Sequence, residues 1–393
     1  MGLGYVGLPN LVNHVQKGYY VTGYDVDLNK VENINNKKSY IEDISSELLQ
    51  KNKEKFHATN DFNSLKDMDI IFIDVPTPIL LDKTPDYKYV QVACEDVINN
   101  SKKGQLIILE STVSPGTTYK YLVKKLSDKG YIVGEDIFIG YSPERIDPGN
   151  KQYNFSDIIR IVSGYSDNCL ELMEALFEDK AHPVSKLEVA ELTKLYENAF
   201  RFINIAFVDE VSKLTNKMGI SFDEVVSAAD SKQYGFMKFT PSYKIGGHCI
   251  PVDPFYMLDY AYSLGVSLNT IVEAANINDS MIYGLIRKID EYIDENEKTD
   301  IKIALIGASY KPNIKDPRMA VANELSDRLI EKEIVFDIFD NLDESIKIGR
   351  FKRSINKIDY DKINKYDLAV ILQEHNYIDF NKIKIDKIYA TRF

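Results

Sequence analysis

The first third of the chain alternates short apolar runs with segments of helical periodicity. The apolar runs are YYVTGYDVD (19–27), DIIFIDVP (69–76), QLIILEST (105–112) and DIFIGYS (136–142). Helical patterns lie between them, for example around residues 87–100 and 117–129. Buried strands that alternate with helices predict a doubly wound parallel sheet. Ligands of such sheets bind at the carboxyl ends of the strands, where this chain carries polar residues. These residues are Asp25, Thr77, Thr112 and Glu144.

A long helix is predicted next, because residues 184–218 contain neither Gly nor Pro. At roughly 1.5 Å per residue a single helix of this length spans about 50 Å. Its apolar positions exceed what one face needs, and FINIAFV (202–208) is apolar on several sides. We therefore expect a helix that bridges two domains and also packs at a subunit interface. Its predicted apolar stripe consists of Val189, Leu192, Leu195, Ala199, Phe202 and Ala206.

The last third returns to the alternating pattern. Its predicted strands are DIKIALIGASY (300–310), IVFDIFDN (334–341), YDLAVILQ (366–373) and KIYAT (387–391), and a helix follows Arg318. The chain is thus predicted to be an α/β protein with two Rossmann-like doubly wound units, joined by a helical domain built on the long helix. We place the three domains at residues 1–180, 181–285 and 286–393.

Composition narrows the class of protein. The chain has 393 residues, 44% of them hydrophobic and 27% charged, which is typical of a globular protein. A net charge of −12 argues against binding to nucleic acid. The apolar runs are too short to span a membrane, and the chain opens on MGLGYVG without a signal-peptide pattern. Three widely spaced cysteines suggest neither disulfides nor a metal site. We expect a cytoplasmic protein without a bound metal.

A GxGxxG motif opens the chain at Gly2, Gly4 and Gly7, and Asp25 follows about 20 residues later. The glycines allow a tight turn, approach of the backbone to a pyrophosphate, and close packing of the following helix. An acidic residue at position 25 favours NAD over NADP, because it repels a 2′-phosphate. The strand that normally precedes this loop is not in the sequence, so we expect the first strand of the N-terminal unit to be missing. The alternative is a structural glycine loop.

The segment KIGGHCIPVDP (244–254) carries a candidate nucleophile, Cys249. Gly246 and Gly247 indicate a backbone with positive φ or one that another group approaches closely. His248 is the obvious base for the thiol, but we expect sequence neighbours to point apart. Asp253 is better placed, since residues four apart share a face if this segment begins a helix. Cys94 and Cys169 lie in helical patterns and are expected to be packing residues.

Lys194 and Asn198 share one face of the long helix. A solvated polar pair is the simple alternative, but Lys194 lies among leucines, and a partly desolvated lysine can transfer protons or bind an oxyanion. Glu144 follows a strand end in YSPERIDPGN; it is either a loop carboxylate or a group that activates water for hydrolysis.

Taken together, these motifs resemble the UDP-glucose/GDP-mannose dehydrogenase family. The resemblance covers nearly the whole chain and follows the order of motifs in the family: GLGYVGLP, PTP, ESTVSPGTT, SPERIDPGN, KLYENAFRFINIAFVDE, GGHCIPVDP and YKPNIKDPR.

The resemblance implies a four-electron oxidation of a nucleotide sugar with two NAD⁺, in which Cys249 captures the aldehyde as a thiohemiacetal that is oxidised to a thioester. By the same likeness Lys194 and Asn198 hold the oxyanion and the water, Asp253 assists proton transfer, Glu144 serves thioester hydrolysis, and Thr112 orders a water. The expected cofactor contacts are Gly4, Tyr5, Val6, Gly7, Asp25, Lys30, Thr77, Thr112 and Arg318. The expected substrate contacts are Glu144, Arg145, Lys194, Asn198, Arg201, Gly246, Gly247 and Lys311. The family also implies a homodimer formed through the central helix and a C-terminal unit that binds the UDP moiety.

Within the family, the motifs are most similar to members that oxidise UDP-N-acetylglucosamine. Members that act on UDP-N-acetylmannosamine or UDP-glucose remain alternatives, because PSYKIGGHC stands where the family usually has PGPGxGGHC. Two other readings stay open: a two-electron hydroxyacid dehydrogenase, which has no use for Cys249, and a non-catalytic protein that binds NAD or nucleotide sugars.

Overall fold

The computed structural model describes residues 1–393 except 42, 146–156, 299, 344 and 392–393. The chain divides into two compact units. Unit 1 comprises Met1–Glu197 and Phe255–Val266, and unit 2 comprises Asn198–Pro254 and Ser267–Phe393. Part of the SPERIDPGN motif, residues 146–150, lies outside the described residues.

Unit 1 contains two sheets. The smaller is a parallel pair, β1 (Val21–Tyr24) and β2 (Phe56–Thr59). The larger has five strands in the order β3 (Ile70–Ile73), β4 (Leu106–Leu109), β5 (Phe138–Tyr141), β6 (Arg160–Gly164) and β7 (Ala181–Pro183). The sheet is parallel except for the antiparallel pair β5–β6, which differs from the all-parallel sheet that we predicted.

Met1 and Gly2 connect the two sheets of unit 1 through backbone hydrogen bonds. Gly2 donates a backbone hydrogen bond of 2.8 Å to the carbonyl of Tyr24, the last residue of β1. On the other side, Asp74 donates a backbone hydrogen bond of 2.8 Å to Met1. Met1 and Gly2 therefore lie in the position between β1 and β3.

Helices cover both faces of the larger sheet. The helices of unit 1 are α1 (Gly7–Gln16), α2 (Leu28–Asn35), α3 (Ser46–Lys51), η1 (Phe62–Asp67), α4 (Lys88–Asn100), η2 (Tyr119–Val123), α5 (Lys124–Asp128), α6 (Asp167–Phe177), η4 (Glu178–Lys180) and most of α9 (Asp253–Ser263). Ile107 and Leu109 of β4 pack with α4, η2 and α5, whereas Leu106 and Ile108 pack with α6. Adjacent residues of the strand thus serve opposite layers, which explains why the run LIIL is apolar throughout.

The two cysteines that we expected to be packing residues are both fully buried. Cys94 lies in α4 and Cys169 in α6. Burial raises the pKa of the Cys94 thiol to about 12, so this group stays protonated.

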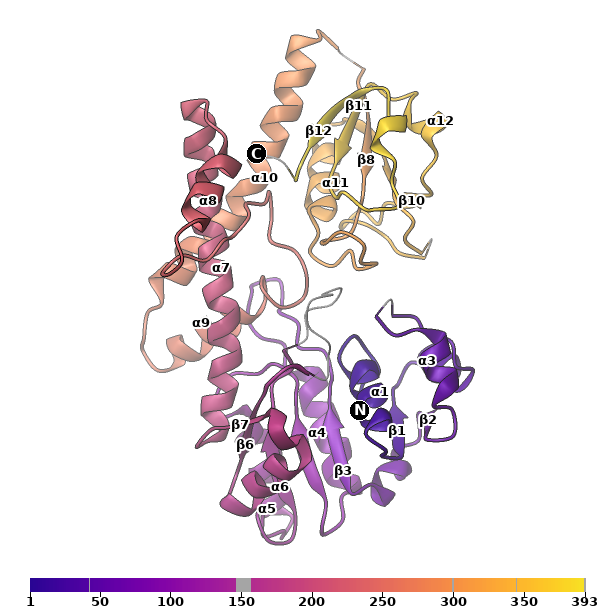
Figure 1. Ribbon diagram of the computed structural model, residues 1–393, viewed down its shortest axis with the longest axis vertical. Helices are drawn as coiled ribbons and strands as arrows, with labels where there is room; N and C mark the ends of the chain where they lie inside the picture. Colours follow the sequence, from indigo (N-terminus) through magenta and orange to yellow (C-terminus); the bar gives the residue numbers. More distant parts are fainter. Residues whose placement is uncertain (42, 146–156, 299, 344, 392–393) are drawn as a thin grey trace. The chain divides into compact units, whose positions relative to one another are not determined.

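The long predicted helix is α7 (Leu187–Met218), a single helix of 32 residues that begins in unit 1 and continues into unit 2 (Figure 1). Four positions of the predicted stripe are buried: Leu195, Ala199, Phe202 and Ala206. The other two, Val189 and Leu192, are exposed. They belong to a second apolar stripe on an adjacent face, spaced at multiples close to 3.6 residues. This exposed stripe consists of Val189, Leu192, Tyr196, Phe200, Phe207, Leu214 and Met218.

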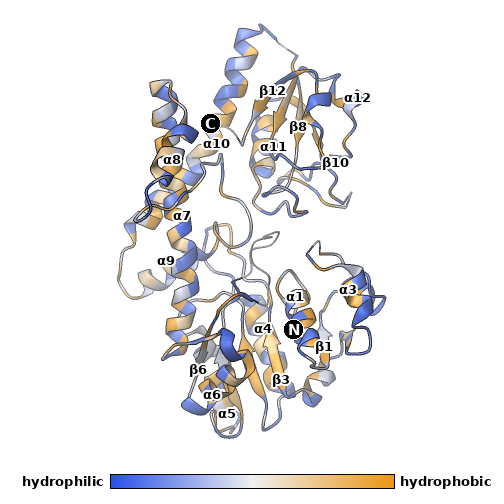
Figure 2. Cartoon of the chain, in the orientation of Figure 1, coloured by the Kyte–Doolittle hydropathy of each residue, from blue (hydrophilic) through white to orange (hydrophobic). Residues whose placement is uncertain are grey.

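Unit 2 contains an all-parallel sheet in the order β10 (Ile355–Asn356), β9 (Val335–Phe339), β8 (Lys302–Ile306), β11 (Leu368–Ile371) and β12 (Asp386–Tyr389). Its other elements are α8 (Phe222–Asp230), α10 (Asn269–Glu295), α11 (Val321–Glu331), α12 (Tyr360–Ile363) and η5 (Phe380–Lys382). Figure 2 shows β3 of unit 1 and β8 of unit 2 as largely hydrophobic strands, as expected for the inner part of a covered sheet.

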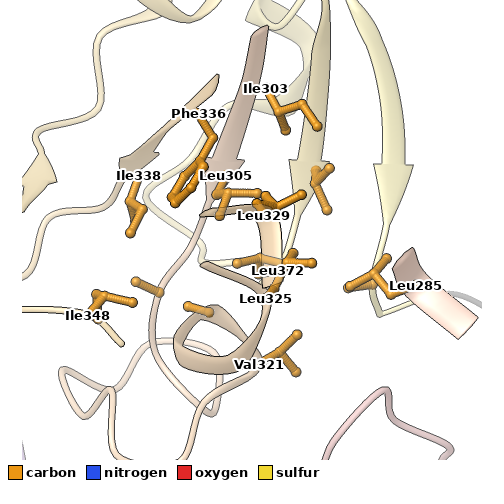
Figure 3. Packing of buried hydrophobic residues seen from close by; sticks show 14 of the residues in the cluster. Leu285, Ile303, Leu305, Val321, Leu325, Leu329, Phe336, Ile338, Ile348 and Leu372 are labelled. Atoms are coloured by element: carbon orange, nitrogen blue, oxygen red, sulfur yellow. The ribbon is translucent and has the colours of Figure 1, made fainter. Parts of the chain in front are cut away.

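Apolar residues of α10 and α11 cover one face of this second sheet. Figure 3 shows Val321, Leu325 and Leu329 of α11 packed with residues of β8 and β9. Those strand residues include Ile303, Leu305, Phe336 and Ile338. The two Rossmann-like units and the long helix confirm the predicted fold class.

Both Rossmann-like units use an aspartate in the same way. Asp25, at the end of β1, accepts a hydrogen bond of 2.7 Å from the backbone of Leu3. Asp340, at the end of β9, accepts one from the backbone of Ala308, which follows β8. Asp25 thus fixes the glycine loop that contains Leu3, and Asp340 fixes the loop that follows β8. Each carboxylate shapes the carboxyl edge of its sheet.

Candidate functional site

The glycine loop at the N-terminus has the geometry of a dinucleotide cradle. Gly2 has φ +91°, and a Cβ there would lie 2.4 Å from the carbonyl oxygen of Asp74. A Cβ at Gly7, the first residue of α1, would lie 1.7 Å from the carbonyl oxygen of Gly2. A Cβ at Gly4 would meet no atom within 4 Å. Two glycines therefore serve the turn and the packing, whereas Gly4 leaves open space in which a ligand can approach the backbone.

Asp25 stands beside this loop. Its carboxylate is buried and accepts hydrogen bonds from the backbone N–H groups of Leu3 (2.7 Å) and Asp27 (2.9 Å). Lys30 Nζ lies 3.2 Å from the same carboxylate. The arrangement fixes an acidic group where the fingerprint expects the contact with ribose hydroxyls.

The remaining expected cofactor contacts of unit 1 lie at the same edge. Tyr5 and Val6 form the turn between the glycines, directly before α1. Thr77 and Thr112 are half-buried, and they follow the neighbouring strands β3 and β4. The first turn of α1 contains no acidic residue, so its N-terminus can accept an anion. These residues fit NAD.

A buried cluster of charged side chains surrounds Glu144. The guanidinium of Arg160, from β6, forms ion pairs with both Glu144 and Glu110. Glu110 follows β4 and also accepts a hydrogen bond from Asn10 of α1. All four side chains are buried. We did not predict Arg160 or Glu110; a charged residue inside the apolar runs IIRIVSG and LIILEST was the available signal.

Lys194 lies in the same unit as Glu144. Its ammonium group is buried and donates a hydrogen bond of 2.6 Å to the backbone carbonyl of Glu144. Three residues earlier, Glu191 accepts hydrogen bonds from Gly116 (2.6 Å) and Thr118 (2.8 Å), which fixes α7 against the ESTVSPGTT segment. Burial raises the pKa of Glu191 to about 7. The predicted desolvation of Lys194 is confirmed.

Arg145, an expected substrate contact, lies against α7. Its Nη2 forms an ion pair of 2.5 Å with Glu197, and its Nη1 donates to the carbonyl of Ile159 at 3.0 Å. Arg201, four residues after Glu197 on the helix, is exposed.

Asn198, Cys249 and Asp253 come together in unit 2. Asn198 Nδ2 donates a hydrogen bond of 2.6 Å to the carboxylate of Asp253, and both side chains are buried. The backbone N–H of Asp253 donates one of 2.8 Å to the carbonyl of Cys249. α9 begins at Asp253 and not at Cys249, so the two residues do not share a helix face as expected, although this hydrogen bond closes a turn between them. Cys249 itself is half-buried, unlike Cys94 and Cys169.

The expectation that His248 and Cys249 point apart was wrong. Burial of the imidazole lowers its pKa, but hydrogen bonds to Asp316 and Cys249 outweigh this and raise the pKa of His248 to about 9. His248 Nδ1 lies 3.6 Å from Asp316 and 3.2 Å from Arg318 Nη2. The segment from Gly247 to Cys249 belongs to no helix or strand, and Gly247 has φ +95°. Neighbouring side chains here are not forced to opposite sides, as they are in a strand.

Asp316 organises the YKPNIKDPR segment. Its buried carboxylate accepts hydrogen bonds from Arg318 at 2.6–3.0 Å. Although burial opposes ionisation, its hydrogen bonds with His248 and Arg318 hold the pKa of Asp316 well below the usual value. The carbonyl of Arg318 in turn accepts from Gly247 at 3.1 Å. Lys311, an expected substrate contact, is half-buried in the same segment.

The unusual PSYKI sequence before Gly246 is anchored at three points. Asp209 of α7 accepts from the backbone of Ser242 (2.7 Å), Asn278 of α10 accepts from Ile245 (2.8 Å), and Lys244 pairs with Glu324 of α11. These anchors hold the loop that leads to Cys249.

The glycines of the loop serve close contacts, as expected. A Cβ at Gly246 would lie 2.6 Å from the Cβ of Tyr310, and one at Gly247 would lie 3.0 Å from the ring of Tyr310. Tyr310 opens the YKPNIKDPR segment, so the two segments pack too closely for any other residue type.

The described part of the chain holds no group of three or more His, Cys, Asp or Glu side chains that could bind a metal ion. Among the same residues, no helix is long and apolar enough to cross a membrane.

Comparison with known proteins places the chain in a family. The NAD binding domain of the UDP-glucose/GDP-mannose dehydrogenase family matches residues 1–181, its central domain residues 188–280, and its UDP binding domain residues 304–392. The chain belongs to this family. It is an NAD-dependent nucleotide-sugar dehydrogenase, an oxidoreductase, and NAD is its cofactor.

The names of individual relatives specify different sugars. A UDP-N-acetyl-D-glucosamine 6-dehydrogenase from Pseudomonas aeruginosa is 34% identical over 86% of this chain and 81% of its own. A UDP-N-acetyl-D-mannosamine dehydrogenase from Methanocaldococcus jannaschii is 30% identical over 99% of this chain and 88% of its own. A solved structure of a UDP-D-ManNAc dehydrogenase from Pyrococcus horikoshii is 27% identical, with a TM-score of 0.84 over 99% of this chain and 92% of its own.

Proposed function

We propose that this enzyme oxidises the C6 hydroxyl of a UDP-N-acetylhexosamine, UDP-N-acetylglucosamine in the first place, to the uronic acid, for the synthesis of surface polysaccharide. The relative from P. aeruginosa supports the glucosamine form, and the motifs around SPER and GGHCIPVDP point the same way. The enzymes from M. jannaschii and P. horikoshii support N-acetylmannosamine as the second candidate.

The observation that carries the mechanism is the surroundings of Cys249. It is the half-exposed cysteine of the three, it precedes the N-terminus of α9, and the Asn198–Asp253 pair stands beside its helical turn. His248, with its raised pKa, presents an imidazolium to the thiol at neutral pH. A cation and a helix N-terminus both stabilise a thiolate, the form that attacks a carbonyl.

The reaction then follows from the residues. When bound, NAD⁺ accepts a hydride in each of two oxidations. The first oxidation yields an aldehyde at C6, and Cys249 adds to this carbon so that the aldehyde is not released. The second removes the remaining hydrogen of C6 as hydride and leaves a thioester. Water then forms a C–O bond while the C–S bond breaks, and one alcohol, two NAD⁺ and one water become one carboxylate, two NADH and three protons.

We assign the polar groups by the charge that each step develops. The ammonium of Lys194 and the amide of Asn198, one turn apart on α7, stabilise oxyanions. Asp253 assists proton transfer near Cys249, Glu144 takes a proton from the hydrolytic water, and Thr112 orders a water near the sugar. Gly4, Tyr5, Val6, Gly7, Asp25, Lys30, Thr77, Thr112 and Arg318 contact NAD. Arg145, Arg201, Gly246, Gly247 and Lys311 contact the UDP-sugar.

We further propose that the enzyme is a cytoplasmic homodimer that associates through α7. The exposed apolar stripe from Val189 to Met218 supports this, because a solvated helix rarely carries so continuous an apolar face. In this proposal residues 1–180 bind NAD, residues 181–285 dimerise, and residues 286–393 bind the UDP moiety.

A panel of UDP-sugars with NAD⁺ tests the proposal. The wild type is expected to give the highest kcat/KM with UDP-N-acetylglucosamine. Cys249→Ser should form no uronic acid, because a serine hydroxyl is not ionised at neutral pH. Full acid formation by Cys249→Ser would refute the nucleophile. Tight binding of a UDP-hexosamine by the wild type without any turnover would show a non-catalytic binding protein instead.

A further inference from the structure

Arg160 is a buried cation without a role in the chemistry assigned above. It lies at the start of β6, and its guanidinium forms ion pairs with Glu110 and Glu144. Its Nε also lies 3.4 Å from Ser142 Oγ. A buried charge with so many partners is costly unless it is fully paired. The pairing therefore specifies one arrangement of the two carboxylates.

The three buried carboxyl groups near Arg160 are not equivalent. Burial raises the pKa of both Asp74 and Glu110, and the two groups contact each other. One proton held between these two carboxyls lowers their combined charge. Asn10 adds hydrogen bonds to both. The charge of Arg160 is then available to Glu144, the third carboxyl of the cluster.

Glu144 is fixed at three points. Its Oε2 accepts from Arg160, its Oε1 accepts from the backbone of Arg145 at 2.6 Å, and its carbonyl accepts from Lys194 at 2.6 Å. These contacts restrict the rotation of the Glu144 side chain, as a positioned base requires.

We propose that Arg160 is a positioning residue for thioester hydrolysis, which holds the carboxylate of Glu144 in one orientation for the attacking water. This inference rests on the proposed function. In the step concerned, the water oxygen bonds to C6, one water proton passes to Glu144, and the C–S bond breaks to release the Cys249 thiolate. The two hydride transfers do not need this carboxylate, so loss of Arg160 should slow the hydrolysis of the thioester alone.

Other charged groups lie near Glu144. Asp74 and Glu110 interact with its carboxylate, Lys194 donates to its backbone carbonyl, and the side chain of the next residue, Arg145, pairs with Glu197. His14 of α1 lies close to Arg160. Burial lowers the pKa of His14 to about 4, so this side chain adds no charge at neutral pH. Among the described residues, removal of Arg160 leaves Lys194 and Arg145 as cations near Glu144, and both have other partners.

Arg160→Met and Arg160→Lys test the proposal in a rapid-mixing experiment with UDP-N-acetylglucosamine and excess NAD⁺. Arg160→Met should still produce two NADH per active site in a first burst. Its steady-state rate should then fall by about 10²-fold, within the range that loss of a general base gives. Intact mass should show an acyl adduct on Cys249. Arg160→Lys keeps the charge without the two-pronged geometry and should show a smaller effect of the same kind.

Two results would overturn the role of Arg160. One is an equal loss of the burst and of the steady-state rate, which indicates a purely structural residue. The other is a wild-type rate with no adduct. If Arg160→Met does not fold, Arg160→Lys decides, and a wild-type steady-state rate with no adduct in that variant would sink the proposal. Glu144→Gln separates the positioning role of Arg160 from the role of Glu144 as base. This variant should accumulate the same adduct, and its failure to do so would refute the proposed role of Glu144 itself.

Discussion

Asn198 donates a hydrogen bond of 2.6 Å to the carboxylate of Asp253, and both side chains are buried. The pair joins α7 to the first residue of α9, four residues after Cys249. Asp253→Asn keeps the size of the side chain and removes its charge. We expect kcat to fall by about 10²-fold or more, because proton transfer by a positioned group contributes about 10²–10⁴-fold. Initial rates at saturating UDP-sugar and NAD⁺ measure this, and a kcat within twofold of the wild type would contradict the assignment.

The glycine loop gives a prediction with a built-in control. Gly4→Ala adds a methyl group to open space, so the thermal stability should hardly change while the Kd for NAD⁺ rises at least tenfold. Gly7→Ala forces a Cβ against the carbonyl of Gly2 and should destabilise unit 1 by about 1–3 kcal/mol or more. Calorimetric titration with NAD⁺ and thermal unfolding separate the two effects. Unchanged NAD⁺ binding by Gly4→Ala would argue against a pyrophosphate contact there.

His248 should control the reactivity of Cys249. Because Cys94 and Cys169 are fully buried, iodoacetamide should modify one thiol per native chain, at Cys249. His248→Asn removes the imidazolium and should slow this alkylation at pH 7 by about tenfold, the rate effect of ~1.4 kcal/mol. Peptide mass mapping identifies the modified cysteine. An equal rate in the variant would show that the contact between the two side chains does not activate the thiol.

Asp209 anchors the loop that leads to Cys249, and its ionisation should make the free energy of unfolding depend on pH. Burial raises the pKa of Asp209 from its ordinary value of 3.8 to about 7. Between these values the unfolded chain loses this proton and the folded chain keeps it, so the contribution of Asp209 to stability falls as pH rises from about 4 to 7. Asp209→Asn cannot titrate but can still accept from Ser242. Its free energy of unfolding relative to the wild type should therefore be higher at pH 8 than at pH 5 in urea titrations. The same difference at both pH values would contradict the assignment.

Strands with strong apolar runs could be predicted from the sequence, whereas weaker elements could not. LIIL and LAVI are buried at every position, so they carry a clear signal. The four-residue strand β2, FHAT, lies in the smaller sheet and does not have this pattern. The 27-residue helix α10 was also missed, although its apolar residues repeat at helical spacing, because no glycine or proline boundary drew attention to it.

The candidate site shows the same limit. Motif residues such as Cys249, Lys194 and Asp253 could be named from spacing. Arg160 and Glu110 could not, because their pairing joins strands 50 residues apart in the chain. His248 was misjudged for a local reason, since the segment from Gly247 to Cys249 belongs to no helix or strand that would fix the directions of neighbouring side chains.

The most direct test of the account is the number of NADH molecules formed for each UDP-sugar consumed. A four-electron oxidation that keeps its aldehyde on Cys249 predicts two NADH and one uronic acid per UDP-N-acetylglucosamine, with no aldehyde released to a carbonyl trap. One NADH per substrate, with aldehyde as the product, would contradict the covalent mechanism.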